Sequence, residues 1–481
     1  MLLSVLVLLV LASTFISSMA DHKIMGCFAI QNSMKIFDYK PSRLNTLNGV
    51  RSLMMLWVIL SHEYSFFIGV SENTMSIPQI LSRWQFLIVE SGFFAVDAFF
   101  FIGGFLVAYA FLKETTSAFF KYPLAILNRY LRLVPAYFVA ILLFYRVFPY
   151  MGSGPYWPFL TPLVQPCDDM WKSLLFINNL TDNMNGICLG WGWYLQNDMQ
   201  LFVYSILMLL IYNHKKMAGY FAIVWSMLAS FAYTMVVTYT HQYRNLNQVG
   251  DAKNNNEYQS TLYIVPWSRA PPYLYGLLLG IFYVNFLAEE KKEESEDFLV
   301  RLKRKLEGNR LLRIGVELTG AIIVFFIMFI QRTNQDELHW SQFVHSLYLT
   351  YAKTLFVMGL SLGILPSILG VRSLVSFVMD TKLFNFVAKV SFCTYLLHIL
   401  IIYQWVGKTS VDTYYSFLTE YDFFVAHSVL SILSGFALCL LVEVPCSKLQ
   451  KMLMVSLMKK DQKKPNTEES SAAINESLKE R

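Results

Sequence analysis

Long apolar runs alternate with short polar stretches along the whole chain. Most runs approach the roughly 20 residues that an α-helix needs to cross the hydrocarbon of a bilayer. Since lipid offers no hydrogen-bond partners to an open backbone, the pattern predicts an all-α, polytopic bundle of about eleven transmembrane helices. The run at 199–212 is shorter than a full crossing. The runs lie near 2–20, 50–69, 86–111, 133–149, 199–212, 217–239, 272–287, 311–330, 347–369, 384–405 and 424–444.

Composition supports this class of protein. Hydrophobic residues make up 55% of the 481 positions and charged residues 15%, whereas a soluble domain carries about a quarter charged residues. The lipid bilayer is therefore the expected environment. The net charge of +6 needs no nucleic-acid partner to explain it, because the basic residues gather in particular loops.

The distribution of Lys and Arg predicts the orientation. Cytoplasmic loops close to helix ends retain basic residues. With the N-terminus exoplasmic and the C-terminus cytosolic, the loops assigned to the cytosol hold 28 of the 39 Lys and Arg. The exoplasmic loops hold 7, and 4 lie within spans. Those cytosolic segments are 21–49, 112–132, 213–217, 288–313, 370–383 and the tail from 445.

Three segments organise the chain. Residues 1–43 form a first transmembrane helix and a cytosolic linker, 44–458 form the membrane core, and 459–481 form a polar tail expected to be disordered. The run at 2–20 also has features of a signal peptide, but its positive flank follows the apolar stretch, so we favour an uncleaved helix. Residues 289–313 have mixed charge with helical spacing and predict a cytosolic surface helix.

Cysteines and a sequon agree with this orientation. Cys167 and Cys188 fall in one exoplasmic loop, where an oxidising compartment permits a disulfide. Asn179 begins the sequence Asn-Leu-Thr between them, a glycosylation signal. The remaining cysteines are expected to be free thiols. They are Cys27, Cys393, Cys439 and Cys446.

The second apolar run contains the strongest candidate chemistry. Arg51 and His62 are eleven positions apart, about three helical turns, so they share a helix face about 16 Å apart along the axis. Arg51 would lie at the cytosolic interface and His62 deep in the membrane. A neutral imidazole there can take a proton from an attacking hydroxyl. Alternatively, Arg51 only extends its charge to the interface and His62 only bonds a neighbouring helix.

Charged residues near the next two runs are further candidates. Glu90 and Asp97 are seven positions apart and predicted on one face. Asp97 would orient His62 or balance a cation, or serve packing alone. Arg129 and Arg132 share one side of a helix at the cytosolic interface, where guanidinium groups bind phosphate. A positive-inside flank would have the same pattern.

Other polar residues near or within spans complete the candidate set. Ionisable groups inside a membrane are functional candidates by default, and His398 lies in the middle of a run. Trp191 and Trp193 are interpreted as interface anchors. The further candidates are Asp198, Arg269, His398 and Glu443. No zinc-ligand spacing, phosphate-binding P-loop or serine-nucleophile motif is present, so no metal is expected.

Four motifs in order resemble the acyltransferase family 3 membrane enzymes, and more narrowly their nose-resistant-to-fluoxetine-like branch. The resemblance covers about Leu44 to Pro445. Two departures stand out, since Gly103 occupies a common Ser position and members of the branch often carry an exoplasmic domain before the first helix. The motifs are Leu47-Asn48-Gly49-Val50-Arg51 leading to His62, Val96-Asp97-Ala98-Phe99-Phe100 leading to Gly104, Arg129 to Pro135, and Trp193-Tyr194-Leu195 to Met199-Gln200.

The resemblance implies a membrane-bound O-acyltransferase in the endoplasmic reticulum or the plasma membrane. It implies that Arg51 and His62 form the active core, and that Arg129 and Arg132 hold acyl-CoA on the cytosolic side. It also implies that Cys167 pairs with Cys188. The acceptor would be a hydroxyl-bearing lipid, sterol, sugar or small molecule. The alternative is a lipid or small-molecule transporter or binding protein that keeps the scaffold without catalysis.

Overall fold

The computed structural model describes residues 2–19, 23–113, 118–160, 167, 169–181, 188–244, 255–292, 295–336 and 340–462. These residues are overwhelmingly helical, and their only β-type pairing is an isolated parallel bridge between Ser71 and Thr413. The predicted all-α class is therefore confirmed. The predicted tail at 459–481 lies mostly outside the described residues.

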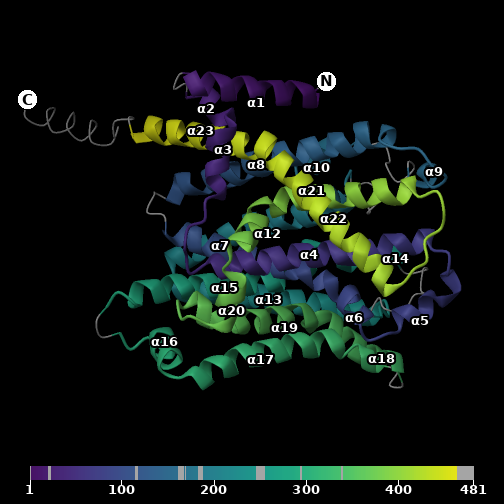
Figure 1. Ribbon diagram of the computed structural model, residues 1–481. Coiled ribbons are helices and arrows are strands. Elements are labelled where there is room, and N and C mark those ends of the chain that lie inside the picture. The colour runs from purple at the N-terminus through teal and green to yellow at the C-terminus, as the bar shows by residue number, and fades with distance from the viewer. Residues whose placement is uncertain are drawn as a thin grey trace, which may run out of the picture. The chain divides into compact units, whose positions relative to one another are not determined.

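The described residues include twelve long helices, which Figure 1 labels. They are α1 (Leu2–Met19), α4 (Asn45–Phe67), α7 (Phe94–Lys113), α8 (Ala118–Leu142), α12 (Trp193–His214), α13 (Lys216–Thr240), α15 (Pro266–Glu289), α17 (Arg310–Phe329), α19 (Gln342–Ile368), α21 (Lys382–Lys408), α22 (Phe417–Leu438) and α23 (Val444–Gln462). The shorter helices are α2 (Met25–Phe28), α3 (Ile30–Met34), α5 (Ile77–Leu81), α6 (Phe86–Glu90), α9 (Trp157–Leu160), α10 (Met170–Leu174), α11 (Asn178–Thr181), α14 (Asn255–Tyr258), α16 (Phe298–Gly308), α18 (Arg332–Asp336) and α20 (Leu374–Met379).

The chain divides into two compact units. The smaller unit comprises Met1–Ile36, Phe119–Ala136 and Leu438–Arg481. The larger unit comprises Phe37–Ala118 and Tyr137–Ala437. Most of the candidate residues belong to the larger unit, whereas Arg129, Arg132 and Glu443 belong to the smaller one.

Nine helical stretches within the described residues are long and apolar enough to cross a membrane, so the predicted count of eleven is not confirmed. The two predicted spans outside this set are α1, whose described apolar part covers Val7–Ser17, and α12. The first turns of α12 carry Gln196, Asn197, Asp198 and Gln200, which lower its apolar character.

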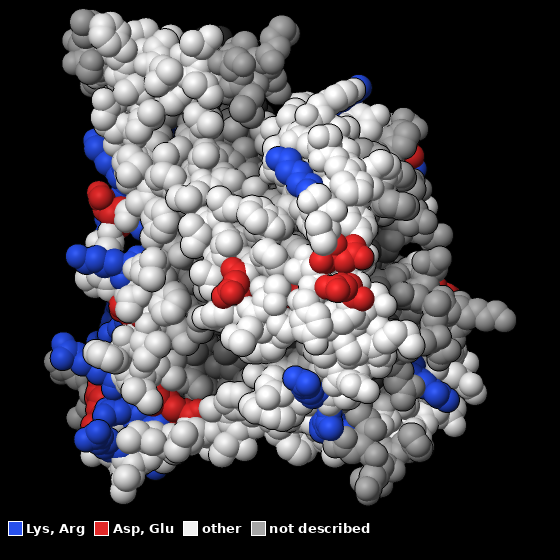
Figure 2. Space-filling model, turned by 45° about the vertical axis from the view of Figure 1, so that its right-hand side comes forward, with Lys and Arg blue, Asp and Glu red and all other residues white. Residues whose placement is uncertain are grey.

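The outer helices present apolar side chains to their surroundings. In α13 Phe221 and Trp225 are exposed, as are Ile322 and Phe325 in α17. Charged side chains cover little of the face shown in Figure 2. A surface of this kind is stable in lipid, because lipid tails are as apolar as the side chains that meet them.

Glycines allow α7 and α15 to approach closely. A Cβ added to Gly104 would overlap the carbonyl oxygen of Tyr273, and one added to Gly276 would overlap that of Phe101. Small residues at such contacts let helix backbones pack directly in a membrane. The backbones of α7 and α15 therefore meet directly at Gly104 and Gly276.

Polar contacts gather several loops at one end of the larger unit. Glu290 accepts hydrogen bonds from Arg43 at 2.6 Å and from Lys303 at 2.8 Å. Burial alone would raise the pKa of Glu290, but these two cations lower it below its ordinary value. Tyr39 donates to Asp380 at 2.9 Å. These segments, 21–49, 288–313 and 370–383, are among those predicted to face the cytosol.

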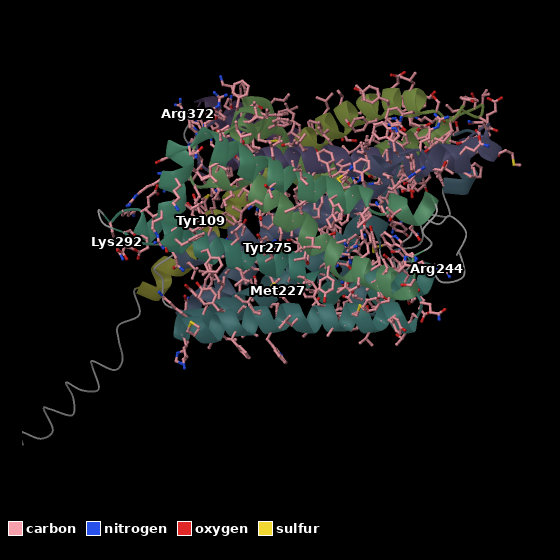
Figure 3. The ribbon with its side chains drawn as sticks, turned by 90° about the horizontal axis from the view of Figure 1, so that it is seen from below. Tyr109, Met227, Arg244, Tyr275, Lys292 and Arg372 are labelled. Atoms are coloured by element: carbon pink, nitrogen blue, oxygen red, sulfur yellow. A yellow bond between two sulfur atoms is a disulfide. The ribbon has the colours of Figure 1, made fainter. Side chains whose placement is uncertain are left out.

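The predicted exoplasmic loops meet at the other end of this unit. Gln342 donates to the carbonyl of Tyr243 at 3.0 Å, and Tyr156 donates to Asp412. Figure 3 shows Lys292 and Arg372 towards one end and Arg244 at the opposite end. The loops therefore separate into the two predicted groups. Which group faces the cytosol remains a prediction from charge.

The close contact between α7 and α15 yields a stability prediction. We expect Gly104→Ala to lower the free energy of unfolding by about 1–3 kcal/mol, because the added methyl group must displace a neighbouring backbone. Thermal or denaturant unfolding in detergent measures this. Gly315→Ala in α17 is the matched control, since no atom of a neighbouring element lies within 4 Å of a Cβ added at Gly315. Equal stability of the two variants would contradict the packing account.

Candidate active site

Helix α4 carries both residues of the predicted active core. Arg51 and His62 lie on this one uninterrupted α-helix, and both side chains are half-buried. Eleven residues at about 100° each return to nearly the same angular position, about 16 Å further along the axis. The predicted placement of the two residues on one helix is therefore confirmed.

His62 contacts a second histidine from α21. Nδ1 of His62 lies 3.3 Å from Nε2 of His398 and 2.9 Å from the carbonyl oxygen of Val58. Nδ1 of His398 lies 2.7 Å from the carbonyl oxygen of Tyr395. The structure thus brings together two residues that the sequence offered as separate candidates.

These contacts assign the tautomers of both rings. A carbonyl oxygen only accepts hydrogen bonds, so Nδ1 of each neutral imidazole carries the proton. Nε2 of His398 then accepts a hydrogen bond from Nδ1–H of His62. The same N–H group also donates to the carbonyl oxygen of Val58. Nε2 of His62 is left with a lone pair. This nitrogen is the atom able to accept a proton.

Aromatic side chains enclose the histidine pair. Phe66 stacks on His62 with ring centroids 5.8 Å apart, and Trp191 presents an edge to His398 at 6.4 Å. The Tyr395 hydroxyl donates to the carbonyl of Trp191 at 2.5 Å, while Trp191 Nε1 donates to the carbonyl of Leu396 at 3.3 Å. These bonds hold the segment before α12 against α21.

The tryptophans were predicted as interface anchors, and this interpretation was wrong. Trp191 and Trp193 are 8% and 5% exposed. Trp191 contacts His398, and the ring of Trp193 lies 5.1 Å from the guanidinium carbon of Arg269. Their amphipathic rings pack against buried polar groups. A tryptophan ring, which is apolar with one polar N–H, is as stable in such a place as at a membrane interface.

Asp97 pairs with Arg269 rather than with His62. Arg269 Nη1 lies 3.1 and 3.2 Å from the two Asp97 oxygens, and its Nε donates to the carbonyl of Tyr263 at 2.9 Å. Both side chains are at most 1% exposed. Of the roles considered for Asp97, the structure shows the balancing of a cation. Within the described part of the chain, Asp97 makes no hydrogen bond to His62, so it does not orient that ring.

A buried lysine accompanies this ion pair. Lys353 in α19 is 7% exposed and lies within electrostatic range of both Asp97 and Arg269. Lys353 is one of the four basic residues within predicted spans and was not among the candidates. Its position within an apolar run could have identified it as a candidate, since charged residues inside a membrane almost always face the protein interior or a pathway.

The other acidic candidates belong to elements other than α7 and α15. Glu90 ends α6, and the 3₁₀ turn Ser91–Phe93 separates it from α7, so the predicted common helix face with Asp97 is wrong. Asp198 is buried in the first turns of α12. A Cβ on Gly103 would meet its Oδ1 at 3.5 Å, an ordinary contact. Glu443 is buried in the smaller unit.

The loop before α12 confirms one prediction and opposes another. Cys167 and Cys188 form a disulfide, and the other four cysteines are free. The Asn179 amide nitrogen, however, donates to Asn197 Oδ1 at 2.7 Å and to the carbonyl of Ile264 at 3.1 Å. Because that side chain is buried and bonded within the fold, the structure speaks against the predicted glycan.

Arg129 and Arg132 lie three positions apart on α8, as predicted. Arg132 is exposed and Arg129 is half-buried. Both belong to the smaller unit. Their predicted role in holding the donor is not tested by this geometry.

These features define a class, a helical membrane protein with paired ionisable side chains buried among its spans. Within that class the chain belongs to the acyltransferase family 3, since residues 44–448 match its acyltransferase domain.

The chain is similar to two proteins from Caenorhabditis elegans. It is 26% identical over 468 residues to "Nose resistant to fluoxetine protein 6", covering 91% of this chain and 55% of that protein. It is 26% identical over 301 residues to "Regulator of hypoxia-inducible factor 1", covering 56% and 57%. The chain thus spans a little over half the length of the curated relatives it matches. No solved structure matches it.

The buried ion pair yields a stability prediction. Removing one partner leaves an uncompensated charge, so we expect Asp97→Ala to lower the free energy of unfolding by about 3–5 kcal/mol. The double variant Asp97→Leu with Arg269→Met should recover much of that loss, because it removes both charges of the pair. Denaturant unfolding in detergent measures both. A double variant no more stable than Asp97→Ala would show that the pair is not the cause.

Proposed function

We propose that the protein transfers an acyl group from a thioester donor to a hydroxyl acceptor, with His62 as general base. The observation that carries this proposal is that Nδ1 of the half-buried His62 lies 2.9 Å from the Val58 carbonyl oxygen and 3.3 Å from Nε2 of His398, which leaves Nε2 of His62 to accept a proton. Family membership supports the reaction class. We propose acyl-CoA as the donor.

The chemistry resembles that of other base-assisted acyl transfers. Nε2 of His62 takes the proton of the acceptor hydroxyl as its oxygen bonds to the thioester carbonyl carbon. The carbon–sulfur bond then breaks, and the thiolate regains a proton from the imidazolium. Val58 and His398 hold Nδ1–H throughout. His398 is therefore a positioning residue that also stabilises the positive charge formed on His62.

Arg51 is proposed to anchor the donor. A guanidinium binds phosphate oxygens bidentately, and the helix places this one about 16 Å from His62. A donor with a phosphate group at one end and a thioester at the other would span this distance. Arg129 and Arg132 are proposed to bind phosphate groups of acyl-CoA by the same bidentate chemistry.

The test is transfer of a labelled acyl group from acyl-CoA in microsomes, followed to its product. Loss of a general base typically costs a factor of about 10²–10⁴, so we expect His62→Ala to reduce the rate by that order. His398→Ala should reduce kcat with a smaller effect on KM for the donor, and Arg51→Ala should mainly raise that KM.

His241→Ala is the matched control, since His241 is exposed at the end of α13. It should transfer at the wild-type rate. If His62→Ala transferred acyl groups as well as the wild type, the assignment would fail. Movement of a lipid or drug across the membrane without any acyl donor would instead favour the transporter.

A further inference from the structure

A second group of ionisable side chains is buried between α4 and α22. Glu63 follows His62 in α4 and accordingly points about 100° away from it around the helix. Its Oε2 lies 2.7 Å from Nδ1 of His427, and both side chains are completely buried. Among the described residues, no hydrogen bond joins this pair to His62 or His398, so it requires its own explanation.

A third ionisable side chain lies beside this pair. Glu420, in the first turn of α22, is completely buried and within electrostatic range of Glu63. Neither of its carboxyl oxygens has a hydrogen-bond partner among the described residues, and Nε2 of His427 and Oε1 of Glu63 also have none. Buried polar atoms are nearly always bonded, so four such atoms in one place are unusual.

The surroundings provide no balancing cation. Phe67 and Phe423 stack on the His427 ring at 6.1 Å, and Trp405 meets it edge-on at 5.2 Å. No Lys or Arg in the described part of the chain forms an ion pair with Glu63 or Glu420. The imidazole of His427 offers at most one positive charge to two carboxyl groups.

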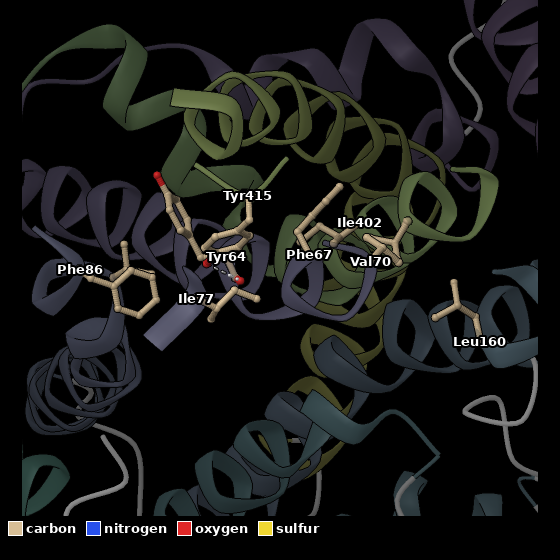
Figure 4. Close-up of a cluster of buried hydrophobic side chains, with 10 residues drawn as sticks. Tyr64, Phe67, Val70, Ile77, Phe86, Leu160, Ile402 and Tyr415 are labelled. Atoms are coloured by element: carbon tan, nitrogen blue, oxygen red, sulfur yellow. Dashed lines mark hydrogen bonds between the residues drawn. The ribbon is translucent and has the colours of Figure 1, made fainter. Parts of the chain in front are cut away.

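The neighbouring tyrosines do not supply the missing protons. Tyr64 donates its hydroxyl to the carbonyl of Phe417 at 3.0 Å, and Tyr415 donates its own to the carbonyl of Tyr64 at 3.1 Å. Figure 4 shows Tyr64 and Tyr415 among the apolar side chains of this cluster. Both hydroxyl protons are therefore already engaged with backbone oxygens.

We propose that Glu63, His427 and Glu420 form a proton-binding site, in which Glu420 is a protonated carboxylic acid at neutral pH. With both acids ionised, the group would carry a net negative charge in an apolar interior, which is costly. One bound proton on Glu420 removes that charge. A proton also needs no coordination shell, so it fits a place closed by aromatic rings.

The position in the fold indicates where this proton exchanges. Glu420 lies one turn from the start of α22, beside the segment that pairs Thr413 with Ser71. In the predicted topology this end is exoplasmic. Buried carboxyl and histidine groups near a membrane face are the usual elements of proton relays. The site thus gives the protein a proton-dependent element separate from acyl transfer.

The test is infrared spectroscopy of the purified full chain, which separates the carbonyl stretch of a carboxylic acid from that of a carboxylate. We expect an acid band at neutral pH that shifts in D₂O. This band should be missing from Glu420→Gln, so it should appear in the difference spectrum of wild type minus Glu420→Gln. Glu72→Gln, at an exposed position near the same end, should leave it unchanged. The difference spectrum is needed because Glu90 also has a buried, unbonded oxygen.

Should Glu420→Gln not accumulate in folded form, Glu420→Asp retains an acid, and the band should then move rather than vanish. An unchanged acid band in Glu420→Gln, or a wild-type spectrum without any acid band at neutral pH, would overturn the proposal. None of these results depends on acyl transfer, so they leave the proposed function to its own test.

Discussion

The cost of placing an ionisable group in an apolar interior governs the arrangement of this protein. Water is absent there, so each charge needs a partner, a proton or a route to the surface. The apolar exterior of α13 and α17 follows from the bilayer as solvent. The interior then has to satisfy a small number of polar side chains within a close-packed bundle.

The larger unit meets this requirement in three different ways. Asp97 and Arg269 form a complete ion pair whose remaining guanidinium surface lies against aromatic rings. His62 and His398 are joined by one N–H···N contact, which leaves Nε2 of His62 able to react. At Glu63, His427 and Glu420 the charges do not balance without another proton. We therefore propose function at the two sites where a buried polar group lacks a hydrogen-bond partner or a balancing charge.

Helix periodicity explains which of these features could be predicted. Arg51 and His62 were placed correctly because both belong to one helix, where spacing alone sets geometry. The same rule failed for Glu90 and Asp97, because a 3₁₀ turn interrupts the helix between them. Partners distant in sequence, such as His398 for His62 and Arg269 for Asp97, depend on helix packing, and single-sequence patterns do not contain it.

Two general tendencies also misled the sequence analysis. Tryptophan near a span often marks the membrane interface, yet Trp191 and Trp193 line the interior because buried polar groups there need amphipathic neighbours. The Asn-Leu-Thr sequence fits a sequon, yet Asn179 is tied into a buried amide network. In α12 the same polar residues that make this network also obscure the apolar pattern expected of a span.

The central claim is that both rings of the histidine pair are neutral and carry their protons on Nδ1. Nitrogen NMR of protein labelled in its eight histidines, with His62 and His398 assigned through His62→Gln and His398→Gln, tests it directly. The account predicts a protonated Nδ1 and an unprotonated Nε2 for both residues at neutral pH. A charged His62, or a proton on its Nε2, would contradict it.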